Sequence, residues 1–284
     1  MDSISALTKG LKEGRRRWRL TIIIYTIQLM MALTIGLQVY QVIASSIGHS
    51  MSVEEIIDGY NHTVLRDFIN VHGSSLATLI GQLRWFVAIY LVVSAFVHAG
   101  LLGTITKNGD DWLEFWGNGA RFFRPFFLIS IIHLVIFTVW TLIILIPVLL
   151  GLFPAIESLN RETPIYYGLG FSVILWLIGV GFIYLLSFYS KWHIIESGRG
   201  IRKAIWRGWK FTLKHLRSLI LIIGILAVLT SFIWIANYWL ELTVGIRTEI
   251  LILIFILIQQ AVVLGRIYLR VSGYCSLHHF ASHS

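Results

Sequence analysis

Residues 126–150 read "FFLISIIHLVIFTVWTLIILIPVLL" and contain no charged residue. A stretch of about 20 apolar residues is long enough to cross the hydrocarbon core of a bilayer as a helix. Five further blocks of this kind lie at 20–43, 80–102, 165–190, 218–240 and 249–270. Charged residues make up only 13% of the chain, against roughly 25% in soluble domains. The sequence therefore predicts an all-α polytopic membrane protein, with six transmembrane helices in a single membrane domain over residues 1–284.

The distribution of positive charge predicts how these spans are oriented. With six spans, both ends of the chain lie on the same side of the membrane. Of the 23 Lys and Arg residues, 19 fall on that side, and the four on the opposite side are Arg66, Arg84, Arg161 and Arg247. Because cytoplasmic loops carry an excess of Lys and Arg, both termini are predicted to be cytoplasmic. The net charge of +9 is then a consequence of membrane insertion and does not indicate a nucleic-acid partner.

Three stretches before odd-numbered spans resemble one another. In their alignment Gly119 matches Gly208, and Gly10 matches Gly208 in the faintest copy. The three stretches are "NGDDWLEFWGNGARFF" (108–123), "SGRGIRKAIWRGWKFT" (197–212) and "ALTKGLKEGRRRWRLTI" (6–22). Repeated units are common in polytopic proteins. We therefore expect an internal repeat of a cytoplasmic amphipathic helix plus two spans, with repeated interfacial helices within 103–125 and 191–217.

The copy before the fifth span is the most basic. On a helical wheel its Lys and Arg residues lie on one side and its apolar residues on the rest, which is typical of a helix in the headgroup plane. Each such base contributes about 1 kcal/mol near an anionic leaflet. The alternative is a helix packed against other cytoplasmic elements. The residues predicted to contact anionic lipid, or a protein partner in a membrane complex, are Arg199, Arg202, Lys203, Trp206, Arg207, Trp209, Lys210, Lys214 and Arg217.

The connection between the first two spans is long and falls on the extracytoplasmic side. Segment 45–79 predicts one or two amphipathic helices, with Ser52 and Glu55 as a capping box. Its residues Glu54, Asp58 and His62 share a helical face at a spacing that can bind a metal. Arg66 continues that face, and a cation there favours a solvated polar face over a metal site.

A few polar side chains lie within the predicted spans, where polar groups tend to face protein or water. They are Gln28, His98, His133, Asn237, Gln259 and Gln260. Hydrogen bonds between helices are their simplest role. The span interiors contain no carboxylate, which argues against proton-coupled or cation-coupled transport. We find no nucleotide-binding, metalloprotease or nucleophile motif, so we expect no catalytic residue, no metal and no cofactor.

The stretches "NGARFFRPFFLIS" and "RGWKFTLKHLRSLILI" each lead from a cytoplasmic helix into a span. This pattern resembles a group of uncharacterised six-span bacterial inner-membrane proteins, which is similar to the membrane domain of some glycerophosphodiester phosphodiesterases. "GHSMSVEEIIDGYNHTVLRDFINVHG" resembles the outer segment of inner-membrane proteins from Bacteroidota-like bacteria. The resemblance implies a non-catalytic protein of the bacterial inner membrane.

These observations leave three hypotheses. The leading one is a non-enzymatic inner-membrane scaffold or subunit that works through lipid or protein contacts. The second is a transporter or lipid-handling protein with a path lined by His133, Gln259 and Gln260. The third is an enzyme acting on lipid headgroups, which requires acids and histidines to meet at the outer face around Asp58, His62 and Asp67.

Overall fold

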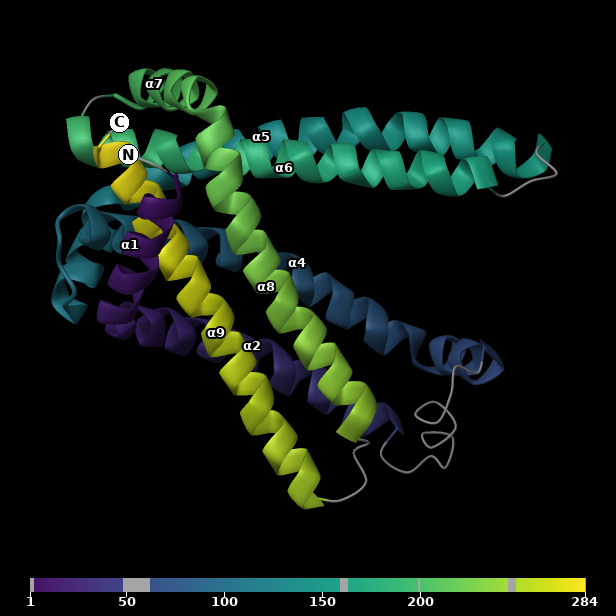
Figure 1. Ribbon diagram of the computed structural model, residues 1–284. Helices are drawn as coiled ribbons and strands as arrows, with labels where there is room; N and C mark the ends of the chain where they lie inside the picture. Colours follow the sequence, from purple (N-terminus) through teal and green to yellow (C-terminus); the bar gives the residue numbers. More distant parts are fainter. Residues whose placement is uncertain (1–2, 48–61, 159–162, 199, 245–248, 284) are drawn as a thin grey trace. The chain divides into compact units, whose positions relative to one another are not determined.

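The computed structural model describes residues 3–47, 62–158, 163–198, 200–244 and 249–283, and almost all of them are helical. Figure 1 labels the helices in chain order. Their bounds are α1 Ser3–Arg16, α2 Trp18–Ile47, α4 His62–Thr106, α5 Trp112–Ser158, α6 Thr163–Ser197, α7 Ile201–Lys214, α8 Leu216–Val244 and α9 Glu249–Ser282. The described residues contain no strand. The all-α fold predicted from the sequence is confirmed.

Six helices of the described part are long and apolar enough to cross a membrane. Each corresponds to one of the predicted spans, and the membrane-protein class is thereby confirmed. The candidate spans are Trp18–Gln41, Arg84–Thr106, Trp112–Gly151, Tyr166–Ser197, Leu216–Leu240 and Ile250–Ser282. We call the ends of these helices near Trp18, Thr106, Trp112, Ser197, Leu216 and Ser282 their inner ends. Helices α4, α5, α6 and α9 extend past the predicted spans at their inner ends, because buried apolar side chains continue to pack there.

The chain divides into two compact units, Ile23–Ser94 and a larger unit made of Met1–Ile22 with Ala95–Ser284. In the larger unit the buried side chains lie at the inner ends of the helices, as Leu101, Phe115, Tyr189 and Leu277 illustrate. The remaining lengths of α5, α6, α8 and α9 carry many exposed apolar side chains. Such surfaces are stable in contact with lipid tails, which agrees with the membrane class.

The two short helices of the larger unit each pack on the inner end of a span. Helix α1 lies against α9, and α7 lies against α6, while α5 pairs with α6 and α8 pairs with α9 (Figure 1). Both short helices use glycine at the contact. A Cβ added at Gly208 would lie 2.6 Å from the backbone nitrogen of Ser190, and one added at Gly10 would overlap Ser276. Side chains larger than hydrogen at these two positions would push the helices apart.

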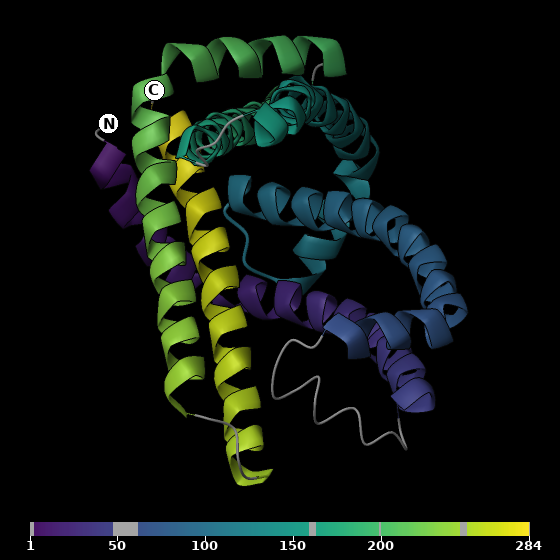
Figure 2. The same ribbon diagram turned by 90° about the vertical axis from the view of Figure 1, so that its right-hand side faces the viewer.

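The stretch before the third span differs from the expected separate helix. Helix α4 ends at Thr106, a short loop follows, and α5 then runs without a break from Trp112 into the span. Pro125 lies inside α5 and lacks the backbone N–H that would bond to the preceding turn. The helix therefore curves without ending, and Figure 2 shows this change of direction. In the other two copies the helix is interrupted, at Arg17 and at His215.

Candidate functional site at the inner ends of the helices

The inner end of α4 closes with a left-handed residue. Asn108 has φ of 58°. Its N–H bonds to the carbonyl of Ile105 at 3.1 Å, and the N–H of Gly109 bonds to the carbonyl of Thr104 at 3.0 Å. This pair of bonds is the Schellman arrangement, which satisfies carbonyls left over at a helix C-terminus. Asparagine tolerates the left-handed conformation better than most residues, so the sequence suits the turn.

Arg17 is fully buried and binds this helix end. Its Nη1 donates to the carbonyl of Gly109 at 2.8 Å and to that of Thr104 at 3.2 Å. Its Nη2 donates to the Oδ1 of Asn108 at 3.5 Å and forms an ion pair with Glu13. A cation at a helix C-terminus also interacts favourably with the helix dipole. One side chain from the α1–α2 junction is therefore tied to the α4–α5 loop.

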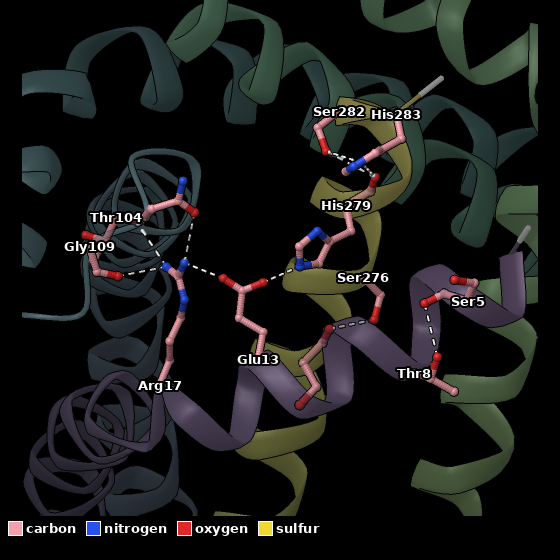
Figure 3. A network of polar contacts seen from close by, with 12 residues as sticks. Ser5, Thr8, Glu13, Arg17, Thr104, Gly109, Ser276, His279, Ser282 and His283 are labelled. Carbon is pink, nitrogen blue, oxygen red and sulfur yellow. Dashed lines mark hydrogen bonds and ion pairs between the residues drawn. The ribbon is translucent and has the colours of Figure 1, made fainter. Parts of the chain in front are cut away.

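Glu13 connects Arg17 to the last helix. Its second carboxylate oxygen bonds to the Nε2 of His279 on α9, so the carboxylate bridges two partners (Figure 3). Partial burial would raise the pKa of Glu13, but Arg17 and His279 outweigh it and hold that pKa below the ordinary value of 4.5. We call Glu13, Arg17, Asn108 and His279 the Arg17 network. It joins three parts of the chain that are far apart in sequence.

A second group of polar residues lies between α5 and α6 in the same unit. Lys191 of α6 is only 8% exposed, and its Nζ lies 5.9 Å from the centroid of the Phe126 ring on α5. His133, two helical turns beyond Phe126 on α5, is 4% exposed. The His133 Nδ1 donates to the carbonyl of Ile129 at 2.8 Å, and its buried Nε2 has no hydrogen-bond partner among the described residues. Lys191 interacts electrostatically with His133.

Helix α9 contributes a further cation to this region. Arg270 interacts electrostatically with Lys191, and its Nη2 contacts the Nε2 of His98 on α4. The His98 ring in turn stacks on Tyr274, with ring centroids 5.9 Å apart. We call Lys191, His133, Arg270 and His98 the basic cluster. Four helices therefore bring basic side chains together. Two of these side chains, His98 and His133, are among the intramembrane polar residues indicated by the sequence.

Helix α7 presents its charges on the surface away from α6. Ala204, Gly208 and Thr212 are buried, so the face used for packing consists of small residues. The exposed face contains Trp206 and Leu213 among the bases Arg202, Lys203, Arg207, Lys210 and Lys214. Trp209 and Arg217 flank this surface, the first half-buried and the second exposed. Part of the apolar side of α7 thus contacts protein, as in the packing alternative.

The other predicted polar residues lie apart from these groups. Gln28 is half-buried in the smaller unit, and Gln259 and Gln260 are half-buried on α9. The close approaches of Gly265 to Ile233 and of Gly273 to Leu226 set an antiparallel register between α9 and α8. This register places Asn237 level with the two glutamines. His133, on α5, belongs to the basic cluster, so the three residues of the predicted path do not share one helix pair.

Some predicted positions lie outside the described residues. They include Arg199, Ser52, Glu54, Glu55 and Asp58. Residues His62 onward belong to α4, so the end of the predicted outer segment is helical and continues into the second span. Among the residues that the structure describes, no group of three His, Cys, Asp or Glu side chains is placed to hold a metal ion.

Sequence reasoning missed three of the residues that organise the inner ends. Arg17 stands in "RRRWR" (15–19), where it is counted with its neighbours as a charge that sets topology. Lys191 is likewise counted as a charge that sets topology. The stretch "FYSKWHII" (188–195), however, places mainly apolar and aromatic residues around it and offers no acid within four positions. That isolation is a usable signal of a buried cation. The sequence does not indicate the bridging role of Glu13, because Arg17 is near in sequence but the second partner, His279, comes from a distant segment.

The fold and these sites define a six-span, all-helical integral membrane protein with basic residues gathered at the inner ends of its helices. No family model, no curated protein and no solved structure matches the chain.

Proposed function

We propose that the protein is a non-enzymatic scaffold or subunit of the bacterial inner membrane that acts through contacts with anionic lipid at the cytoplasmic leaflet. The observation that supports this function is the exposed basic face of α7, interrupted by Trp206 at 71% exposure and Leu213 at 59% exposure. Amphipathic tryptophan and basic residues are typical of a helix surface at headgroup level. Because small residues already pack α7 on α6, its outward face is available for such contacts.

Helix α1 supports the same proposal independently. Its side facing away from α9 exposes Lys9, Lys12, Arg15 and Arg16, and Trp18 follows at 57% exposure. Two basic, tryptophan-bearing surfaces thus flank the inner ends of the spans. The proposed topology, with both termini cytoplasmic, agrees with these basic surfaces. The relation to the membrane domain of some glycerophosphodiester phosphodiesterases stays a proposal that rests on the sequence resemblance alone.

The repeat is part of the proposal. The three glycines that the alignment matches each approach the inner end of an even-numbered span. Gly10 meets Ser276 of α9, Gly208 meets Ser190 of α6, and a Cβ added at Gly119 would lie 2.7 Å from the Phe96 ring of α4. Three units with equivalent packing would present three basic or mixed surfaces around the same end of the spans. Such an arrangement suits a scaffold that touches the leaflet at several points.

The full chain, reconstituted in nanodiscs, tests the lipid contact. We expect phosphatidylglycerol to raise its melting temperature above that in phosphatidylcholine alone. Replacing Arg202, Lys203, Arg207 and Lys210 with Gln removes about 1 kcal/mol of lipid attraction per charge, so most of this shift disappears. The control variant Lys203→Arg with Lys210→Arg keeps the charge and the shift. An equal response in the Gln variant contradicts the proposed function.

A further inference from the structure

Lys191 carries a buried positive charge that the described residues around it stabilise only weakly. It is a cation with 8% of its surface exposed, and within the described part of the chain no carboxylate pairs with it. Among the described residues, the Phe126 ring, with its centroid 5.9 Å from the Nζ, makes the one favourable contact with this charge. A cation–π contact offsets only a small part of the free energy that removing an ion from water costs. The charge of Lys191 therefore lacks adequate compensation within the protein.

The groups around Lys191 add positive charge and a hydrogen-bond acceptor. Arg270 repels Lys191 electrostatically, and His133 also lies within electrostatic range of it. Because the Nδ1 of His133 donates to the carbonyl of Ile129, the Nε2 of the neutral ring is an acceptor, and it has no partner among the described residues. An ammonium donor and an imidazole acceptor together suit an oxyanion that has both acceptor oxygens and a hydroxyl group. A phosphate group has this chemistry.

The depth of the cluster in the membrane supports the same ligand. Lys191 lies within the fourth candidate span, Tyr166–Ser197, less than two helical turns from its inner end and so near the level of the lipid headgroups. A phosphate group can reach that level either as part of a lipid headgroup or as a free anion from the aqueous side.

We propose that the basic cluster is an interior binding site for a phosphate group, with Lys191 donating to its oxygens and the Nε2 of His133 accepting from its hydroxyl group. The site lies within the larger unit and is separate from the exposed face of α7. It therefore stands or fails independently of the proposed leaflet contact.

The test uses the purified full chain in a zwitterionic or uncharged detergent. Inorganic phosphate is titrated against chloride at matched ionic strength, and phosphatidic acid is titrated against phosphatidylcholine. We expect at least one of the two phosphate compounds to bind saturably and to raise the melting temperature. Binding of both compounds, or of inorganic phosphate alone, supports a site open to the free anion. Binding of phosphatidic acid alone supports a lipid-headgroup site. Saturable binding of neither compound to the unaltered protein overturns the proposal.

Variants locate the site. Lys191→Met keeps the length of the side chain but removes its charge, and we expect its phosphate affinity to fall at least about tenfold. It should also melt at a higher temperature than the unaltered protein when no phosphate is present, because an uncompensated buried charge is gone. Arg124→Met is the control and keeps the affinity, because Arg124 is an exposed base on α5 outside both the basic cluster and the exposed face of α7. Unchanged affinity in Lys191→Met overturns the assignment. If that variant does not fold, Lys191→Arg and His133→Leu carry the same test, the first retaining the affinity and the second lowering it.

Discussion

At the scale of single residues, the inner ends depend on one buried guanidinium. Arg17 lies in a run of basic residues, yet its neighbours Arg16 and Trp18 are exposed while it is not. Because Arg17 lies at the junction of α1 and α2, its side chain points toward the carbonyls of Thr104 and Gly109 at the end of α4. A side chain with several fixed donors can bind the carbonyls and Glu13 at the same time, which a lysine ammonium at this place does less well.

Arg17→Met should lower the stability of the protein by about 3 kcal/mol, the range found when one partner of a buried ion pair is removed. The loss arises because the α4 carbonyls and the Glu13 carboxylate lose their donor. Thermal or denaturant unfolding in detergent measures it. Arg16→Met changes the adjacent, exposed residue and should have little effect. Equal stability of the two variants would show that the Arg17 network is not stabilising.

Glu13 makes stability depend on pH in a defined direction. Its pKa is lower in the folded protein than the ordinary value of 4.5, because Arg17 and His279 outweigh the effect of burial. The stabilising contribution is therefore complete above that ordinary value and is lost as the pH falls through the folded pKa. We expect melting temperatures to decrease at acidic pH, and Glu13→Gln to make the decrease smaller. A variant with the same acid sensitivity as the unaltered protein would exclude Glu13 as its source.

Asn108 gives a further residue-scale prediction. Its left-handed conformation at φ of 58° is unfavourable for side chains branched at Cβ. Asn108→Val should therefore destabilise the protein by about 1–2 kcal/mol, whereas Asn108→Gly should be close to neutral. Unfolding midpoints of the two variants distinguish the outcomes, and a Val variant as stable as the Gly variant would contradict the assigned turn.

At the scale of elements, the contact of α7 with α6 depends on the absence of a side chain. Gly208→Ala would place a methyl group 2.6 Å from the Ser190 backbone nitrogen. We expect α7 to move away and stability to fall by about 1–3 kcal/mol, as in other overpacked contacts. Gly224→Ala on α8 is the control, because nothing lies within 4 Å of its added Cβ. It should be neutral or slightly stabilising, since alanine favours helix more than glycine does. A Gly208→Ala variant that unfolds like the control would show that the contact is loose.

The elements also show what the sequence can predict. Each of the six spans was found because an apolar stretch of sufficient length is a local and strong signal. The pairing of α1 with α9 was not found, because it rests on Gly10 and Ser276, small residues with no periodic pattern. The continuity of α5 was missed as well, since a proline such as Pro125 can mark either an end or a curve in a helix. His98 and His133 are indicated by the sequence because polar groups in apolar spans are rare, whereas Lys191 is only one of the 19 Lys and Arg residues that set the topology.

At the scale of the whole molecule, the topology can be tested with very few changes. Cys275 is the single cysteine and is buried, so Cys275→Ser yields a chain without thiols. New cysteines at Ser282, near the inner end of α9, and at Tyr167, which is 77% exposed at the other end of α6, report the two sides. An impermeant maleimide should label the second in intact spheroplasts and the first only after permeabilisation. The reverse pattern would invert the proposed orientation.

The contact between α1 and α9 has a consequence for biosynthesis. The hydroxyl of Tyr268 donates to the carbonyl of Leu11 at 3.1 Å, across 257 positions of sequence. Helix α1 is therefore synthesised long before α9 and docks on it only after Tyr268 has left the ribosome. Until then Glu13 lacks its partner His279, and the face of α1 that packs on α9 stays uncovered. The contact between α1 and α9 forms only after α9 has been synthesised, and ribosomal stalling before residue 268 would leave α1 undocked.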